Sequence, residues 1–260
     1  MQKSKDLSKL IKQDKEVPEM ETLITGGGFG FSVTKEELES TEYTLVVIAI
    51  DTSPSVSSFK DALLQALKNA VIGCQSSSRV DYILLRVVLF NSDLTEVHGF
   101  IPVDSIDPDG YEEFKCRNLT ALHDVIGEAV DSTLIYGKQL RDSDYTVNGC
   151  VYIVSDGLDN DSSKYDVNAL KALIEEATQS EKLGSLLSVL VGVNSDGHSD
   201  GKRIGDILEK LQIDVGISQY VDIGKAGPKE LAMLGGHMSK SINSHSQRVK
   251  SGGVSQPVPF

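Results

Sequence analysis

Residues 45–50 read Leu-Val-Val-Ile-Ala-Ile, and the next five, residues 51–55, read Asp-Thr-Ser-Pro-Ser. An unbroken apolar run of this length predicts a strand that is buried on both faces of a sheet. The chain then changes at once to a turn that carries one carboxylate and two serine hydroxyls. Because a hard cation such as Mg²⁺ prefers oxygen ligands, this turn is a candidate part of a cation site.

Apolar periodicity along the rest of the chain predicts strands alternating with helices. The further predicted strands are residues 82–90, 96–103, 149–155, 186–193 and 219–223. The predicted helices are residues 59–71, 119–134, 167–183, 203–211 and 228–246. A turn at residues 91–93 makes the second and third strands a hairpin. The pattern indicates an α/β fold: a doubly wound, mostly parallel sheet with one antiparallel edge strand and helices on both faces.

The charge and the apolar content of the chain exclude some classes of ligand and environment. The chain has 260 residues and a formal net charge of −13, which argues against nucleic acid because phosphate backbones bind Lys and Arg. No apolar run approaches the length of a membrane-spanning helix, and the N-terminus lacks the apolar segment of a secretory signal. We therefore expect a cytoplasmic protein without a membrane partner.

The three cysteines, Cys74, Cys116 and Cys150, fit this expectation. They are odd in number, and their spacing matches neither a disulfide framework nor a zinc site. Free thiols in a reducing compartment are the simpler interpretation.

Composition also predicts the limits of the domain. Residues 1–42 are interpreted as an N-terminal arm or linker, in which the glycine-rich residues 26–31 form a joint rather than a nucleotide-binding loop. Residues 43–248 form the folded domain, and residues 249–260 form a disordered tail rich in Gly, Ser and Pro.

Two further segments bring oxygen atoms to the end of the first strand. The strand at residues 149–155 also ends in an acidic turn, which begins at Asp156, and Thr120 lies at the entry of a helix that leads into this strand. The carboxyl ends of parallel strands meet at one edge of the sheet, where ligands bind. The candidate metal ligands are therefore Asp51, Ser53, Ser55, Thr120 and Asp156. Two carboxylates and three hydroxyls suit Mg²⁺, with Mn²⁺ or Ca²⁺ as other candidate ions.

This pattern resembles the von Willebrand factor type A (VWA) domain with a metal-ion-dependent adhesion site (MIDAS), of the stand-alone cytosolic bacterial type. Asp51-x-Ser53-x-Ser55, the distant Thr120 and the distant Asp156 match the three parts of that motif. Pro54 and the segment Arg117-Asn118-Leu119 stand where the family commonly has glycines.

The resemblance implies a Rossmann-like VWA fold and a protein partner that supplies a carboxylate to the metal. It also implies an adaptor role, serving an AAA-type ATPase or a bacterial stress or defence system. Aspartates at 159, 161, 196 and 200 predict an acidic rim, so we expect basic residues beside the partner's acidic ligand.

Three other interpretations compete with a metal-dependent binding site. Ser53 and Asp51 precede a helix, where such residues ordinarily serve as caps. A Mg²⁺-dependent phosphoryl hydrolase would use Asp51 and Asp156, although the sequence shows no nucleophile or lysine beside them. The third competing interpretation is a structural subunit whose site has lost its metal. Asp196, His198 and Asp200 are interpreted as a surface loop rather than a second cation site.

Overall fold

A computed structural model of the chain describes residues 23–24, 30–31, 40–179, 182–194, 196–199, 202–225, 227–250 and 259. The other residues, which include most of the predicted arm, most of the predicted tail and Asp200, lie outside this description. Within the described residues, no helix is both long and apolar enough to cross a membrane.

The main sheet has the strand order β1-β2-β5-β4-β3-β6-β7-β10 in the described part of the chain. Its strands are β1 (Leu23–Ile24), β2 (Gly30–Phe31), β3 (Glu42–Asp51), β4 (Ile83–Phe90), β5 (Leu94–Pro102), β6 (Thr146–Ser155), β7 (Leu186–Val193) and β10 (Gln219–Gly224). Strands β4, β3, β6, β7 and β10 are parallel, and β5 is antiparallel to β4. The predicted doubly wound sheet with a hairpin is thereby confirmed.

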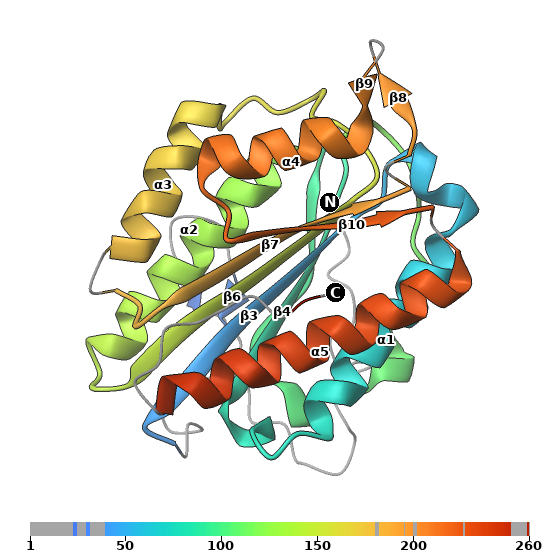
Figure 1. Cartoon of the computed structure of the whole chain (residues 1–260). Helices are drawn as coiled ribbons and strands as arrows, with labels where there is room; N and C mark the ends of the chain where they lie inside the picture. The colour runs from blue at the N-terminus through green and yellow to red at the C-terminus, as the bar shows by residue number, and fades with distance from the viewer. Residues whose placement is uncertain are drawn as a thin grey trace.

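Five α-helices cover the two faces of this sheet in the described residues (Figure 1). They are α1 (Lys60–Gln75), α2 (Leu122–Arg141), α3 (Val167–Gln179), α4 (Ile204–Val215) and α5 (Pro228–Lys250). Helices α1 and α5 pack on one face, and α2, α3 and α4 pack on the other. The side chains of residues 45–50 alternate between the two cores, because successive strand residues point to opposite faces. This double burial explains why the run contains no polar residue.

Several elements differ from the sequence-based expectation. Helix α4 continues to Val215 rather than ending at 211, and it ends at Gly216, which has the positive φ of 82° typical of a helix C-cap. The region around residue 200, predicted as a loop, contains the short antiparallel pair β8 (His198–Ser199) and β9 (Lys202–Arg203). From the predicted arm, β2 pairs with β5 through Phe31 and Phe100.

Strand β3 lies between β4 and β6 in the middle of the sheet. The chain leaves β3 for β4 on one side and later returns to β6 on the other, so the order of the strands reverses at β3. In open α/β sheets, the crevice at such a point is where ligands bind. The carboxyl ends of β3 and β6 therefore define the place to examine.

Candidate metal centre

The turn after β3 brings two serine hydroxyls together. Asp51, the last residue of β3, is buried, and its Oδ1 accepts a hydrogen bond from the backbone N–H of Ser53 at 2.7 Å. A short 3₁₀ helix, η3 (Pro54–Ser58), follows, and Pro54 suits its first position because the fixed φ of proline is helical. The Oγ atoms of Ser53 and Ser55 lie 3.0 Å apart.

Strand β6 ends beside this turn and completes a hydrogen-bonded cluster. The Ser155 hydroxyl, on the last residue of β6, donates to Asp51 Oδ2 at 2.6 Å. The Ser55 hydroxyl donates to Asp156 Oδ1 at 2.8 Å. Four of the five predicted ligands, Asp51, Ser53, Ser55 and Asp156, are thus connected through hydrogen bonds or direct hydroxyl contacts.

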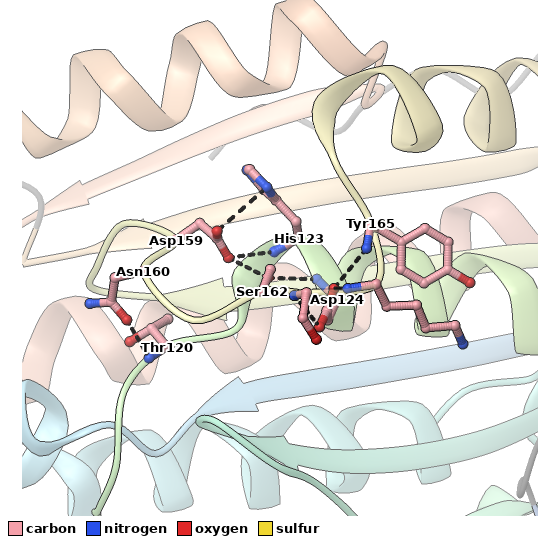
Figure 2. A network of polar contacts seen from close by, with 9 residues as sticks. Thr120, His123, Asp124, Asp159, Asn160, Ser162 and Tyr165 are labelled. Atoms are coloured by element: carbon pink, nitrogen blue, oxygen red, sulfur yellow. Dashed lines mark hydrogen bonds and ion pairs between the residues drawn. The ribbon is translucent and has the colours of Figure 1, made fainter.

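Thr120, the fifth predicted ligand, lies beside the turn that carries Asp156. Its N–H donates to Asn160 Oδ1 at 2.8 Å (Figure 2). Its carbonyl accepts the backbone N–H groups of Asn160 and Asp161. A Cβ built on Gly157 would lie 3.8 Å from Thr120 Oγ1, so the hydroxyl faces the backbone just after Asp156. Thr120 is a buried residue, but its hydroxyl makes no hydrogen bond to the described residues, so its lone pairs are available.

Side chains of the loop after β6 cap the first turn of α2. Asp159 Oδ1 accepts the His123 N–H at 3.1 Å, and its Oδ2 lies 3.5 Å from His123 Nδ1. The Ser162 hydroxyl accepts the Asp124 N–H at 3.0 Å (Figure 2). Thr120 is therefore not needed as the cap of this helix, since other side chains occupy that role.

The carboxylate of Asp124 holds the same loop from the helix side. Its two oxygens accept three backbone N–H groups, each at 2.9 Å, from Ser163, Lys164 and Tyr165. Charge-assisted hydrogen bonds of this kind are among the stronger ones in proteins. Asp124 thus fixes residues 163–165, the part of this loop that lies farthest along the chain from Asp156.

The segment before Thr120 is also fixed to the sheet. The Arg117 N–H donates to the Thr52 carbonyl at 2.9 Å, and the Ala121 N–H donates to the Asn91 carbonyl at 2.9 Å. Between them, Asn118 adopts a positive φ of 63°, a conformation that asparagine tolerates better than most residues. Asparagine here meets a backbone requirement that a glycine would otherwise meet.

The two carboxylates of the cluster are buried without a cationic partner. Burial raises the pKa of Asp51, against the lowering effect of the Ser155 and Ser53 hydrogen bonds. Burial, with the nearby Asp51 charge, raises the pKa of Asp156 to about 6, although the Ser55 hydrogen bond opposes this shift. Within the described residues, neither carboxylate forms an ion pair with Lys, Arg or His. A buried charge of this kind is costly unless an opposite charge accompanies it.

The spacing and chemistry of the donor atoms fit a magnesium ion. With metal–oxygen bonds of about 2.1 Å, neighbouring ligands of an octahedral ion lie about 3.0 Å apart. The Ser53–Ser55 and Ser55–Asp156 oxygen separations of 3.0 and 2.8 Å match that value. Among the described residues, no group of three or more His, Cys, Asp or Glu side chains is placed to hold a metal, so sites of the zinc type find no support there.

The capping alternative and the predicted rim can now be compared with the geometry. Ser53 stands at the N-cap of η3, but its side chain makes no capping hydrogen bond. Of the rim aspartates, Asp159 contacts His123, and Asp196 lies 3.6 Å from Arg203. Asp161 is exposed, whereas Asp200 and the His198 side chain lie outside the described residues.

Sequence reasoning missed two residues that support the centre. Ser155 orients Asp51, and Asn160 holds the backbone of Thr120. A signal for Ser155 was present, because a hydroxyl residue ends a buried strand beside the one that carries Asp51. Asn160 lay in an acidic turn without a local pattern that distinguishes it from its neighbours.

Solved structures of other proteins share this fold. A von Willebrand factor type A protein from Catenulispora acidiphila matches with a TM-score of 0.52 and 15% identity, covering 78% of this chain and 43% of that one. The PilB minor pilin from Streptococcus sanguinis matches with a TM-score of 0.56 and 12% identity, covering 81% and 64%. The pilus adhesin SpaC from Lactobacillus rhamnosus GG matches with a TM-score of 0.53 and 11% identity, covering 80% and 31%.

In each of the three, the aligned part is less than two thirds of the other chain. No protein-family model matches the sequence, and a search among curated proteins finds no match. The topology and these likenesses establish the class of fold: the chain has the von Willebrand factor type A fold, as the sequence resemblance predicted.

Proposed function

We propose that this domain binds a protein partner through a Mg²⁺ ion held by Asp51, Ser53, Ser55, Thr120 and Asp156. The partner supplies a carboxylate to a coordination position that these residues leave open, and the ion is a recognition device. The observation that carries the proposal is the row of Ser53, Ser55 and Asp156 oxygens at the spacing of neighbouring magnesium ligands.

The number and exposure of the donor atoms favour binding of an external ligand. The two carboxylates neutralise a divalent ion, and five side chains that give one oxygen each leave one of its six coordination positions open. Ser55 is exposed, whereas Asp51, Ser53, Thr120 and Asp156 are buried, which leaves the site open on the Ser55 side. A carboxylate approaching from solvent would meet the ion there.

The structural likenesses agree with a binding role rather than a catalytic one. Two of the matched proteins are a minor pilin and a pilus adhesin. The hydrolase alternative needs an activated nucleophile or base, whereas Asp51 and Asp156 are hydrogen-bonded to backbone and serine groups and, within the described residues, not to a lysine or a histidine. We therefore prefer a non-enzymatic module, tested against a phosphoester panel in which turnover that requires Asp51 would reverse this preference.

The first experiment compares thermal unfolding in Mg²⁺ and in EDTA. A ligand that binds only the native state at ten times its Kd stabilises by about 1.4 kcal/mol. For a domain of this size, that stabilisation raises Tm by roughly 3–6 °C. Equal Tm values in Mg²⁺ and EDTA would contradict the metal site.

Substitutions of Thr120 make the same test specific to the centre. The variant Thr120→Val removes the hydroxyl at nearly constant volume, so we expect the Mg²⁺-induced increase in Tm to be lost. The matched variant Thr120→Ser keeps the hydroxyl and should retain most of the increase. Calorimetric titration with Mg²⁺ provides a second readout that does not depend on unfolding.

The pathway follows from the sequence resemblance rather than from the geometry. An adaptor for an AAA-type ATPase, or a component of a bacterial stress or defence system, is the role that the resemblance favours. A direct test is whether a purified AAA-type ATPase binds this protein in Mg²⁺ and not in EDTA. Binding that survives EDTA, or the Thr120→Val substitution, would argue against this role for the metal.

A further inference from the structure

One side of the candidate metal centre is bordered by residues 114–117. The Arg117 N–H contacts the Thr52 carbonyl inside the metal-binding turn. The Cys116 thiol contacts the hydroxyl of Ser57, which lies two residues after Ser55. Burial raises the pKa of this thiol, and the nearby negative charges of Asp51 and Asp156 raise it further. This segment is therefore a direct neighbour of the centre.

The side chains of this segment alternate between core and solvent. Phe114 is buried and Cys116 is half-buried, whereas Lys115 and Arg117 are exposed. The alternation is that of an extended chain with one face on the protein. Within the described residues, neither Lys115 nor Arg117 has an ion-pair partner, so both charges are available on the surface.

A small pocket lies beside Lys115. Its volume is about 270 Å³, and its lining residues are Ser57, Lys60, Glu113, Phe114, Lys115 and Cys116. The Glu113 carboxylate in this lining already pairs with Lys60, which leaves Lys115 as the uncompensated charge. The pocket therefore offers a positively charged surface to an occupant.

A second segment beside the centre carries a negative charge. The Asp161 N–H is tied to the Thr120 carbonyl at 3.2 Å, and the Asp161 side chain is exposed. The neighbouring Asp159 carboxylate turns toward His123 and Ser162 (Figure 2). The candidate centre thus has the basic side chains of Lys115 and Arg117 on one neighbouring segment and the acidic side chain of Asp161 on another.

We propose that the partner carries a second acidic residue, two positions from the carboxylate that reaches the metal, and that this residue binds between Lys115 and Arg117. In an extended segment, residues two apart lie on one face, roughly 7 Å from each other. The inference rests on the proposed function, because the first carboxylate must occupy the metal centre for the second to reach the basic side.

The test uses synthetic peptides rather than an unidentified partner. Each is a Gly-Ser peptide with one central Glu, and the residue two positions before or after that Glu is Glu, Ala or Lys. Binding is followed by ¹⁵N NMR titration in Mg²⁺ and in EDTA. We expect a second Glu on one of the two sides to tighten binding about threefold relative to Ala, and Lys there to weaken it.

Charge reversal assigns the effect to this side of the centre. The variants Lys115→Glu and Arg117→Glu should remove the preference for the second Glu, and the pair together should favour Lys. The control is Lys171→Glu on α3, an exposed lysine without an ion pair among the described residues. This control should leave the preference unchanged.

The outcomes separate this inference from the proposed function. If Mg²⁺ binds and the single-Glu peptide binds only with Mg²⁺, but a second Glu adds nothing, the inference is wrong and the proposed function stands. If Mg²⁺ itself does not bind, the proposed function fails. A preference that persists in EDTA, or that Lys171→Glu alters as much as Arg117→Glu does, also overturns the inference.

Discussion

Two clusters of Asp and Ser side chains lie at the same edge of the sheet and use their oxygen atoms differently. Around Asp124, the carboxylate is fully engaged by three backbone N–H groups. In the candidate metal centre, Ser53, Ser55 and Asp156 face one another, and the Thr120 hydroxyl lies beside them. Similar residue types thus serve either to close a loop or to present oxygens to a ligand. A carboxylate closes a loop where several backbone N–H groups lie within hydrogen-bonding distance of it.

The largest effect is expected from breaking the loop-closing cluster. The variant Asp124→Ala removes the acceptor of three charge-assisted hydrogen bonds, a loss of about 4 kcal/mol after allowance for partial exposure. Tm should fall by roughly 8–16 °C. The decrease should be similar in Mg²⁺ and in EDTA, as measured by circular dichroism.

A matched control for this variant is Asp166→Ala. Asp166 Oδ1 accepts a single backbone N–H, from Ala169 at the start of α3. Its loss should cost about 1 kcal/mol. If Asp124→Ala were no more destabilising than Asp166→Ala, the proposed loop-closing role of Asp124 would be wrong.

The next effect concerns His98, a buried histidine outside both clusters. Its protonation should lower the stability at acidic pH whether or not the metal is bound. His98 Nδ1–H donates to the Gly99 carbonyl, so Nε2 accepts the Tyr111 hydroxyl at 2.8 Å. Burial, with a smaller contribution from the nearby Arg86 charge, lowers the pKa of His98 to about 4. The facing groups are thus Arg86, which pairs with Glu96, and Tyr111.

The sign of the resulting pH dependence follows from linkage. Unfolded His98 binds a proton near pH 6.5 and folded His98 near pH 4, so the unfolded state holds more protons between these values. The stabilisation that comes from neutral, buried His98 is complete above pH 6.5 and is lost as pH falls to about 4. Over this range the free energy of unfolding decreases by about 3 kcal/mol. Urea unfolding of wild type and His98→Phe should show it, equally in Mg²⁺ and EDTA, and identical pH profiles would contradict it.

The smallest effect is expected from removing one hydroxyl of the candidate metal centre. The variant Ser53→Ala should change the stability in EDTA by less than about 1 kcal/mol, because the Ser53 hydroxyl contacts the Ser55 hydroxyl and Asp51, whose carboxylate keeps its bonds from the Ser53 N–H and the Ser155 hydroxyl. The Mg²⁺-induced increase in Tm of roughly 3–6 °C should disappear. The control Ser58→Ala, on the same short helix and exposed, should keep the increase.

Together, Ser53→Ala and Asp124→Ala test the comparison itself. One should lose the response to metal and retain stability, and the other should lose stability and retain the response. If Ser53→Ala lowered Tm equally in Mg²⁺ and EDTA, both clusters would have to be considered structural.

Much of the fold was predictable because strands that are buried on both faces appear in the sequence as uninterrupted apolar runs. The apolar run at residues 45–50 and that at 149–155 each form a strand buried on both faces, and the two are paired neighbours. Once these strands are placed, the chain topology brings the oxygen-bearing residues at their ends together. The contacts of Asp51 and Ser55 with the β6 end follow from this placement.

The remaining features depend on tertiary contacts that local patterns do not record. Asp124 and Asp159 look like ordinary helix and loop carboxylates, and their roles appear only when residues nearly forty positions apart meet. The β8–β9 pair has two residues per strand, too few for a periodic signal. The end of α4 was visible in principle, because Gly216 is a typical helix-terminating residue.

Asn118 has a consequence for the kinetics of recognition. Its left-handed conformation is held between two hydrogen-bonded anchors, at Arg117 and Ala121, so the loop beside the candidate centre is shaped before a partner arrives. A preorganised loop loses little conformational entropy when it is bound. Differences in affinity among partners should then appear mainly in how long each complex lasts, because encounter requires no rearrangement of this loop.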